Sequence, residues 1–354
     1  MGAHGARQLM IGDFVINDHS PCFVIAELGN NHQGDVDQAK QLIAEAHRCG
    51  AHSVKLQKRD NRSLFTKDFF NAVYNGDNSF GKTYGEHREF LEFGRDEYAE
   101  LQTYAKSLGI LLFATAFDIP SVDFLEDLDV PAYKVASGDL TNIPLLRHIA
   151  STGKPMIVST GGAEMHDVAR AHEAVVPLNE RLCLLQCTAG YPPAWEELDL
   201  RVIETYRERF PETTVGFSSH DNGIAMAVVA YTLGARVLEK HFTLNRALKG
   251  TDHAFSLEPQ GFRKLVRDLE RTHAALGGGQ KVKYASEYQP IYKMSKKIVA
   301  ISDLPPHHVL EASDLALRSP GGGLPPYRIG DLVGRSLTRP ISADEALDES
   351  HLGQ

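Results

Sequence analysis

Cysteine, tryptophan and clustered charge are all scarce in this chain of 354 residues. It has four cysteines and one tryptophan, and no two cysteines form a Cys-X-X-Cys pair. We therefore expect neither a disulfide framework nor a zinc-finger site. The formal net charge is −9, and acidic and basic residues are interspersed without a run of Lys or Arg. This pattern argues against binding to nucleic acid or to an anionic membrane, and an anionic substrate would need a local positive site.

Long apolar runs are also missing. No stretch approaches the roughly 20 residues that cross a bilayer, and the N-terminal text MGAHGARQLM lacks the apolar core of a signal peptide. We therefore expect no membrane partner and a cytoplasmic location. The length and the 42% hydrophobic content are enough for one large domain and a small one.

Eight short apolar segments, rich in β-branched residues, alternate with helical patterns. They are residues 22–27, 53–58, 111–117, 133–137, 156–160, 182–187, 214–220 and 236–242. Strands that alternate with helices pair in parallel, and eight such units close most economically into a (β/α)8 TIM barrel of about 250 residues. The sequence therefore predicts a catalytic barrel over residues 20–278, after an N-terminal extension of residues 1–19.

Two segments depart from this alternation. The insertion at 60–93 is too long for an ordinary loop and is rich in aromatic residues and glycine, which favours a cover over the active site. Three glycines at 277–279 interrupt the pattern, and we expect a linker at 279–296. Residues 297–354 alternate short apolar stretches with Pro and Gly turns, which predicts a small β-rich domain.

Two histidines, His220 and His241, end the last two predicted strands. Ser218 and Glu239 are in phase with them, because side chains alternate along a strand. A single histidine at a strand end is more often a hydrogen-bonded packing residue than a ligand. A pair on successive strands favours a metal site, since imidazole is the commonest protein ligand of divalent first-row metals.

Polar residues occur at the end of every predicted strand, where a barrel of this kind carries its catalytic groups. Lys55 and Lys134 are the most informative, because lysine is rarely buried without a partner, and they suggest a bound anion. The hydroxyls could merely satisfy nearby backbone groups, but beside two lysines they fit a cradle for phosphate and carboxylate. These hydroxyls belong to Thr115, Ser137, Ser159 and Ser218.

A series of longer motifs resembles the sialic acid synthase family, in the same order along the chain. The motifs are IAELGNNHQGD, VKLQK, GKTYGEHREFLEF, YKVASGDLTNIPLL, KPMIVSTGG, LLQCTAGYP, VGFSSHDNG, EKHFTL and KGTDHAFSLEP. The C-terminal segment resembles the family's antifreeze-like (SAF) domain. The text is most similar to the animal-type branch, the N-acetylneuraminate-9-phosphate synthases, which act on N-acetylmannosamine 6-phosphate, whereas bacterial members use the free sugar.

The resemblance implies a metal-assisted condensation of phosphoenolpyruvate with an amino-sugar acceptor, N-acetylmannosamine or its 6-phosphate, with release of phosphate. It assigns a divalent metal, Mn²⁺ with Mg²⁺ or Co²⁺ as alternatives, to His220 and His241. It places phosphoenolpyruvate at Lys55, Lys134, Thr115, Ser137, Ser159 and Ser218. It places the sugar at or near Glu27, Gln57, Tyr191 and Asp252. Glu239 would orient a ligand or metal-bound water, and Asp139 is a weaker candidate for water activation.

Some positions depart from the family pattern. Ala189 stands where bacterial members often have Asn. The SAF text is RSPG rather than KRPG, so Arg318 lies one position early and Ser319 occupies the arginine position, which puts a contact from Arg318 to a partner's sugar in doubt. His307 and His308 are expected to face solvent rather than bind metal.

The resemblance also implies a domain-swapped homodimer, in which the SAF domain of one chain covers the other's barrel. Two alternatives stay open. The same chemistry could act on another acceptor, as in legionaminate, pseudaminate or KDN synthases. Alternatively, the departures at Ala189 and Ser319 could mark a carbohydrate-binding barrel that has lost catalysis.

Overall fold

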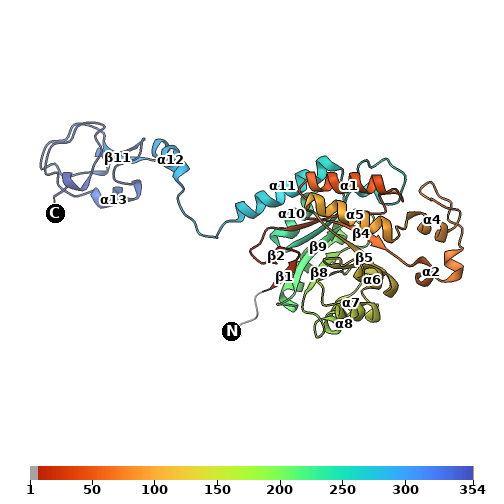
Figure 1. The fold of residues 1–354 in the computed structure, drawn as a ribbon. Helices are drawn as coiled ribbons and strands as arrows, with labels where there is room; N and C mark the ends of the chain where they lie inside the picture. The colour runs from red at the N-terminus through yellow and green to blue at the C-terminus, as the bar shows by residue number, and fades with distance from the viewer. Residues whose placement is uncertain (1–6, 354) are drawn as a thin grey trace. The chain divides into compact units, whose positions relative to one another are not determined.

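The first of two compact units in this protein is a closed barrel of eight parallel strands (Figure 1). The computed structural model describes residues 7–353, and the two units divide between Gly277 and Gly278. The barrel strands are β3 (Phe23–Gly29), β4 (Ser53–Lys58), β5 (Leu111–Ala116), β6 (Tyr133–Val135), β7 (Met156–Ser159), β8 (Leu182–Cys187), β9 (Thr214–Ser219) and β10 (Val237–His241). They follow chain order around the barrel, and β10 closes it against β3. The predicted (β/α)8 barrel is confirmed.

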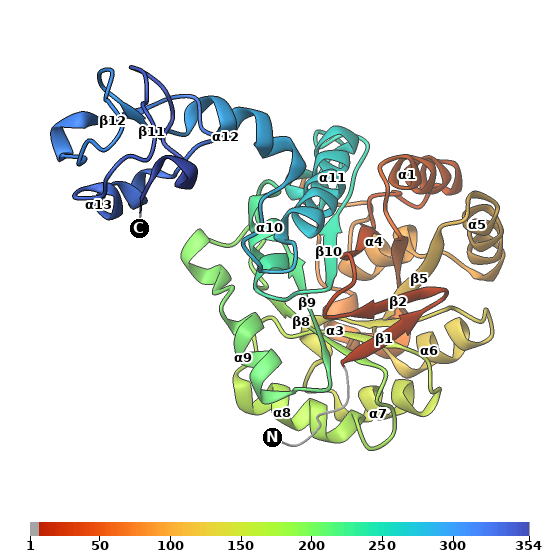
Figure 2. The ribbon, with the colours of Figure 1, turned by 90° about the vertical axis from the view of Figure 1, so that its left-hand side faces the viewer.

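Helices surround the strands (Figure 2). They are α1 (Val36–Arg48), α5 (Arg95–Leu108), α6 (Ile119–Glu126), α7 (Ile143–Ser151), α8 (Met165–Val175), α9 (Val202–Arg209), α10 (Ala225–Thr232) and α11 (Pro259–Leu276). In α1 the Asp35 side chain accepts from the Gln38 N–H, and the buried residues recur at helical spacing. Helix α5 ends at Gly109, whose φ of 76° is left-handed and favours glycine. Local sequence signals therefore set both helix boundaries.

A short hairpin closes the end of the barrel where the strands begin. It consists of β1 (Gln8–Ile11) and β2 (Phe14–Asn17), which pair antiparallel. Leu9, Ile11 and Ile16 are buried in the barrel's apolar core. The sequence predicted only an extension for residues 1–19, of which residues 1–6 lie outside the described residues. A strand of four residues is too short for its alternation of apolar and polar side chains to be recognised from the sequence.

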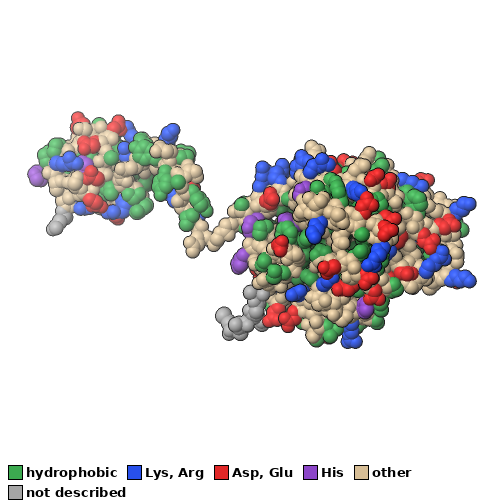
Figure 3. Space-filling model, viewed as in Figure 1, with side chains coloured by type: hydrophobic (Ala, Val, Ile, Leu, Met, Phe, Trp, Pro, Cys, Tyr) green, Lys and Arg blue, Asp and Glu red, His purple; other side chains and the backbone are tan. Residues whose placement is uncertain are grey.

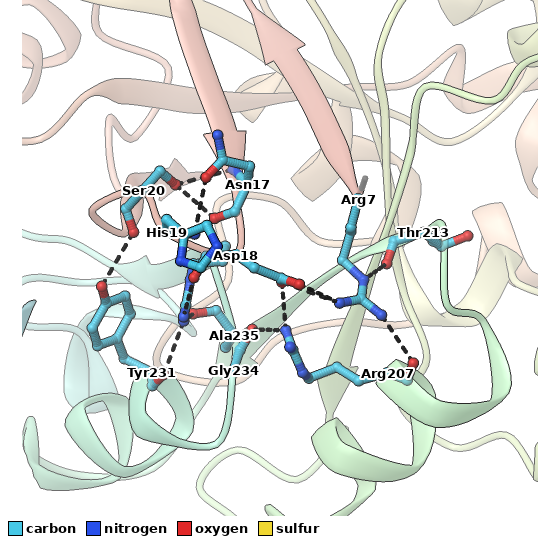
Figure 4. Close-up of polar contacts among 11 residues, drawn as sticks. Arg7, Asn17, Asp18, His19, Ser20, Arg207, Thr213, Tyr231, Gly234 and Ala235 are labelled. Carbon is cyan, nitrogen blue, oxygen red and sulfur yellow. Dashed lines mark hydrogen bonds and ion pairs between the residues drawn. The ribbon is translucent and has the colours of Figure 1, made fainter. Parts of the chain in front are cut away.

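Asp18 ties this hairpin to the barrel (Figure 4). Its carboxylate accepts from Arg7 Nη1 at 2.8 Å and from Arg207 Nη1 at 2.7 Å. Arg7 Nε also donates to the carbonyl of Thr213, the residue before β9, and Arg236 donates to the backbone carbonyl of Asp18. These contacts hold the hairpin against the starts of β9 and β10.

The insertion at 60–93 folds into three short helices, α2 (Asn61–Leu64), α3 (Lys67–Phe70) and α4 (Tyr84–Leu91). Thr83 and Glu86 form a capping box that starts α4. Aromatic rings link the helices, because Phe65 lies 5.1 Å and Phe69 lies 4.6 Å from Tyr84 between ring centroids. The insertion is thus a packed element of the barrel unit.

The second unit has its own small core. Strands β11 (Lys297–Ala300) and β12 (Leu315–Arg318) pair antiparallel, and α13 (Ile329–Leu332) packs beside them. The segment expected to be a linker contains a single 3-10 turn, Ala285–Glu287, and α12 (Tyr288–Met294). The carbonyl of Tyr292 accepts from the Gly321 N–H, which attaches this helix to the second unit. In this unit His307 is exposed, whereas His308 is half-buried and contacts Asp314 at 2.8 Å.

Acidic and basic side chains are interspersed over the visible face of the barrel unit (Figure 3). Among the helices of residues 7–353, none combines the length and apolar character needed to span a bilayer.

We predict that Asp18→Asn lowers the melting temperature at pH 7. Burial raises the pKa of Asp18, but Arg207 and Arg7 outweigh it, so the folded pKa lies below the usual value. A depressed carboxyl pKa stabilises the fold above the unfolded pKa, and this stabilisation is lost as pH falls through the folded pKa. The carboxylate is 34% exposed, so we expect the free energy of unfolding to fall by about 1 kcal/mol or less and the melting temperature to fall by about 2 °C or less.

Thermal unfolding of the variant and the natural protein between pH 7 and about pH 2 checks this. The difference in melting temperature should hold down to about pH 4 and narrow below it, as the pH falls through the lowered pKa of Asp18. Asp13→Asn is the matched control, because Asp13 is exposed in the turn of the same hairpin and has no ion pair among residues 7–353. A difference that stays constant over this pH range would contradict the proposed role of the charge.

Candidate active site

A cavity of about 750 Å³ opens at the carboxyl ends of the barrel strands. Fourteen of the predicted site residues line it: Glu27, Lys55, Gln57, Thr115, Lys134, Ser137, Asp139, Ser159, Tyr191, Ser218, His220, Glu239, His241 and Asp252. Arg318 is not among the lining residues. It lies on β12 in the second unit, where it pairs with Asp344.

Strand register brings these side chains together. Glu27 on β3 lies opposite Lys55 on one side and His241 on the other. Ser218 on β9 is opposite Glu239 on β10. Because neighbouring strands lie about 4.8 Å apart, paired residues that point inward are in contact range. Parallel pairing therefore assembles the site from residues far apart in the sequence.

Two buried lysines form the floor of the cavity. Lys55 Nζ lies 2.6 Å from Glu27 Oε2 and donates to Thr115 Oγ1 at 2.5 Å. Lys134 Nζ lies 3.9 Å from Glu239 Oε1 and donates to the Val135 carbonyl. Paired carboxylates offset the cost of burying these ammonium groups. The floor can also accept an anion, because each ammonium has three donors.

Hydroxyl groups face the same floor. The Ser137 hydroxyl accepts from the Gly161 N–H at 3.0 Å. The buried Ser159 hydroxyl has no hydrogen-bond partner in the part of the chain that the structure describes. Its unused donor is available to a ligand, since buried polar groups are rarely left unpaired. Lysines and hydroxyls together therefore provide the donors that a phosphate or carboxylate needs.

The two glutamates of the floor differ in their affinity for protons. Burial raises the pKa of Glu27 to about 7, aided by the charge of Glu239 and opposed by Lys55. Burial also favours the protonated form of Glu239, but Lys134 and Lys55 outweigh it and lower its pKa. Near neutral pH, Glu239 is therefore ionised while Glu27 can hold or release a proton.

The two histidines lie side by side, with ring centroids 5.3 Å apart. His220 Nδ1 is 3.0 Å from the Thr188 carbonyl, which leaves its Nε2 free to bind a ligand. His241 Nδ1 is buried without a hydrogen-bond partner among the described residues and lies 3.8 Å from Asp252 Oδ2. Burial lowers the pKa of both rings, to about 4 for His220. Both are then neutral at pH 7, as metal ligation requires.

These imidazoles fit a divalent metal with few protein ligands. Within residues 7–353 there is no group of three or more His, Cys, Asp or Glu side chains arranged to hold a metal. The chain would thus supply two nitrogens and leave the other positions to water and substrate. Open positions of this kind are typical of catalytic rather than structural metal sites.

Gly29 makes room for the polar groups beside Glu27. It has a φ of +49° at a bulge where β3 meets β4. A Cβ atom there would lie 3.1 Å from Glu27 Oε1 and 3.2 Å from both Gln57 Nε2 and Asp252 Oδ2. Gln57 Nε2 donates to Glu27 Oε1 at 2.8 Å. Glycine therefore favours both the left-handed φ at this position and the close approach of Gln57 and Asp252 to Glu27.

Two further predicted residues lie on the wall. Tyr191 is 57% exposed, and its ring centroid lies 4.1 Å from that of His220. Asp139 lies in the 3-10 turn Ser137–Asp139, where burial raises its pKa and Asn142 donates to it at 3.2 Å. A carboxyl with a raised pKa is a better proton acceptor once ionised, which suits a group beside an attacking water.

Sequence analysis missed several wall residues. The insertion supplies Leu64, Phe65, Tyr74, Tyr84 and Arg88, and Arg59 follows β4 directly. The aromatic text of the insertion had indicated a cover, but it assigned no role to a particular side chain. Arg59 continues the alternation of Lys55 and Gln57 beyond the strand end, and this signal could have found it.

Comparisons with known proteins agree with this geometry. The NeuB family model matches residues 42–281, and the SAF domain model matches residues 297–353. The chain is 41% identical to human N-acetylneuraminate-9-phosphate synthase, over 97% of this chain and 95% of that protein. It is 36% identical to an N,N'-diacetyllegionaminic acid synthase of Legionella pneumophila, over 94% of each chain.

A solved structure is also similar, the N-acetylneuraminic acid synthetase of Leptospira borgpetersenii in complex with citrate. The TM-score is 0.71 at 31% identity, covering 82% of this chain and 97% of that one. The resemblance seen in the motifs is confirmed, and the chain belongs to the NeuB family, with a C-terminal SAF domain.

Proposed function

We propose that this protein condenses phosphoenolpyruvate with N-acetylmannosamine, or its 6-phosphate, to give N-acetylneuraminate, or its 9-phosphate, and inorganic phosphate. The observation that carries this proposal is one cavity in which paired lysines and the unpaired Ser159 hydroxyl adjoin two neutral imidazoles. The names of similar proteins support it, since the human relative is an N-acetylneuraminate-9-phosphate synthase.

The floor of the cavity suits phosphoenolpyruvate. Lys55 and Lys134 would bind its phosphate and carboxylate, with donors from Ser159 and neighbouring hydroxyls. Its methylene carbon would attack the aldehyde carbon of the open-chain sugar and form the new C–C bond. The aldehyde oxygen must gain a proton, and Glu27, with its pKa of about 7, can donate one.

Formation of the new C–C bond leaves a cationic centre at the carbon that carries the phosphate oxygen, and water would then add to that carbon. Asp139 is the proposed acceptor of the proton that this water loses. The resulting tetrahedral intermediate expels phosphate by cleavage of its C–O bond. Its hydroxyl proton passes to the departing phosphate, which leaves a ketone in the product. Charges and protons therefore balance with groups that line the cavity.

A divalent metal, Mn²⁺ or alternatively Mg²⁺ or Co²⁺, would be held by His220 and His241, with Glu239 orienting a ligand or water beside it. Such an ion would polarise the sugar carbonyl.

The first prediction concerns turnover. Protein supplied with Mn²⁺, phosphoenolpyruvate and N-acetylmannosamine, or its 6-phosphate, should release inorganic phosphate in proportion to a nonulosonate product. Phosphate release and mass spectrometry of the product measure this. If neither sugar supports phosphate release, the acceptor assignment is wrong.

The same chemistry on another acceptor is the second candidate function. The Legionella relative is a diacetyllegionaminic acid synthase at 36% identity, which favours testing that precursor, together with the precursors of pseudaminate and KDN. Parallel kinetics on these sugars would decide between them. A barrel that binds sugars without turnover is a weaker alternative, because both lysines and both histidines are in place.

The metal site leads to a second prediction. His220→Ala and His241→Ala should each weaken Mn²⁺ binding by about tenfold or more and abolish turnover, because each removes one of two protein ligands. Mn²⁺ binding measured by electron paramagnetic resonance gives a readout that is independent of activity. His166→Ala is the control, since His166 is exposed on α8 beside Asp167. Unchanged Mn²⁺ affinity in both site variants would refute the assignment.

We further propose a homodimer in which the SAF domain of one chain covers the barrel of the other. Light scattering at micromolar concentration should give twice the chain mass of 39.0 kDa. A monomer mass under assay conditions would rule this arrangement out. The cytoplasmic location stays a prediction.

A further inference from the structure

The basic side chains that line the cavity differ in whether a carboxylate lies beside them. Lys55 and Lys134 on the floor both face carboxylates. Arg59 and Arg88 line the same cavity, but within residues 7–353 neither has a carboxylate oxygen within the 4.0 Å of an ion pair. Two unpaired guanidinium groups in one cavity are electrostatically unfavourable unless an anion joins them.

Arg59 is held rigidly although it is unpaired. Its side chain is 7% exposed, and its guanidinium carbon lies 3.8 Å from the ring centroid of Phe117. Arg59 Nη2 donates to Gln57 Oε1 at 2.6 Å. Glu92, the carboxylate whose charge acts most strongly on Arg59, is already bonded to Lys58 Nζ and to the Arg59 backbone N–H. The other donors of this guanidinium are left for a ligand.

Arg88 approaches from the insertion. It lies one turn beyond Tyr84 on α4, and its Nε and Nη2 donate to the Tyr84 hydroxyl at 3.0 and 2.9 Å. The carboxylates of the cavity wall have other contacts, because Asp252 lies beside His241 and Asp139 accepts from Asn142. Both guanidinium groups are thus free to bind a common anion.

Charges of both signs surround these arginines, and positive charge prevails around His87. Burial, together with the charges of Arg88, Lys249 and Arg59 and against the charge of Asp252, lowers the pKa of His87 to about 4. Burial and the charge of Arg88 lower the pKa of Arg59 to about 10, so it remains charged at neutral pH. Gln57 and Glu27 link Arg59 to the lysine floor: Arg59 donates to Gln57, and Gln57 donates to Glu27.

We propose that Arg59 and Arg88 form a phosphate-binding subsite for the far end of the acceptor, which makes a phosphorylated amino sugar the preferred substrate class. This rests on the proposed function, because Gln57 and Glu27 lie between the subsite and the floor where phosphoenolpyruvate would bind. Two guanidinium forks match the oxygens of a dianionic phosphate, whereas a neutral sugar hydroxyl would leave both charges unpaired.

Arg88→Met is the sharper test, because Arg88 contacts no other predicted site residue. The natural protein should favour N-acetylmannosamine 6-phosphate over N-acetylmannosamine in kcat/KM. Arg88→Met should raise KM for the phosphorylated sugar by about 10- to 100-fold. KM for phosphoenolpyruvate and for the free sugar should change much less than KM for the phosphorylated sugar, and Arg88→Lys should restore part of the preference.

Arg59→Met should also weaken use of the free sugar, because Gln57 loses the donor that orients it. Arg62→Met is the matched control. Arg62 belongs to the same insertion, but its guanidinium pairs with Glu89 and does not line the cavity.

Equilibrium binding of both sugars, measured by calorimetry, separates this proposal from the proposed function. Preferential binding of the 6-phosphate that Arg88→Met abolishes supports the subsite, even if no phosphate is released and the turnover assignment fails. Equal or tighter binding of the free sugar by the natural protein overturns the subsite. An Arg88→Met variant that loses affinity for both sugars alike overturns it as well.

Discussion

The burial of four charges at one end of the barrel is the constraint on which the catalytic unit depends. Lys55, Lys134, Glu27 and Glu239 are each 5% exposed or less. Removing an ion from water costs several kcal/mol even after relaxation, so these groups must be paired and held rigidly. The two ion pairs differ in length, since Lys134 Nζ lies 3.9 Å from Glu239 Oε1 while Lys55 Nζ lies 2.6 Å from Glu27 Oε2. A ligand anion can therefore enter where the ion pairs are loose.

The rest of the barrel unit provides the stability that this end does not. The apolar core extends from the hairpin residues Leu9 and Ile16 to the helices on the outside. Asp18 and its arginines fasten the hairpin at the opposite end of the barrel from the cavity. Because the cavity is polar at its floor, apolar burial elsewhere must offset the cost of the charges. The SAF unit has a separate apolar core, and the residues of that core are not part of the apolar burial that stabilises the barrel.

Several features of the fold and site were predictable because they depend on local periodicity. The strands Ser53–Lys58 and Leu182–Cys187 have the predicted bounds, since the first alternates polar and apolar residues and the second is an almost continuous apolar run. The phase of Lys55 with Gln57, and of Glu239 with His241, follows from the alternation of side chains. Fourteen of fifteen candidate residues line one cavity for this reason, whereas Arg318 belongs to the second unit.

Other features were not accessible from local pattern. Helix α12 lies in a segment expected to be a linker, because its seven residues bury no side chain and so show no apolar periodicity. Arg88 was overlooked, since its place in the cavity depends on how an insertion of three short helices folds back.

The sequence by itself determined the number and order of the barrel strands, their inward faces and the kinds of polar group at their ends. These follow from spacing within single segments. Tertiary structure alone decided which carboxylate pairs with which lysine and that Glu27 can hold a proton near neutral pH. It also decided that Arg59 and Arg88 have no carboxylate partner among residues 7–353. Each of these depends on distances across the barrel between residues far apart in the chain, and electrostatic energy varies with distance and burial rather than with sequence.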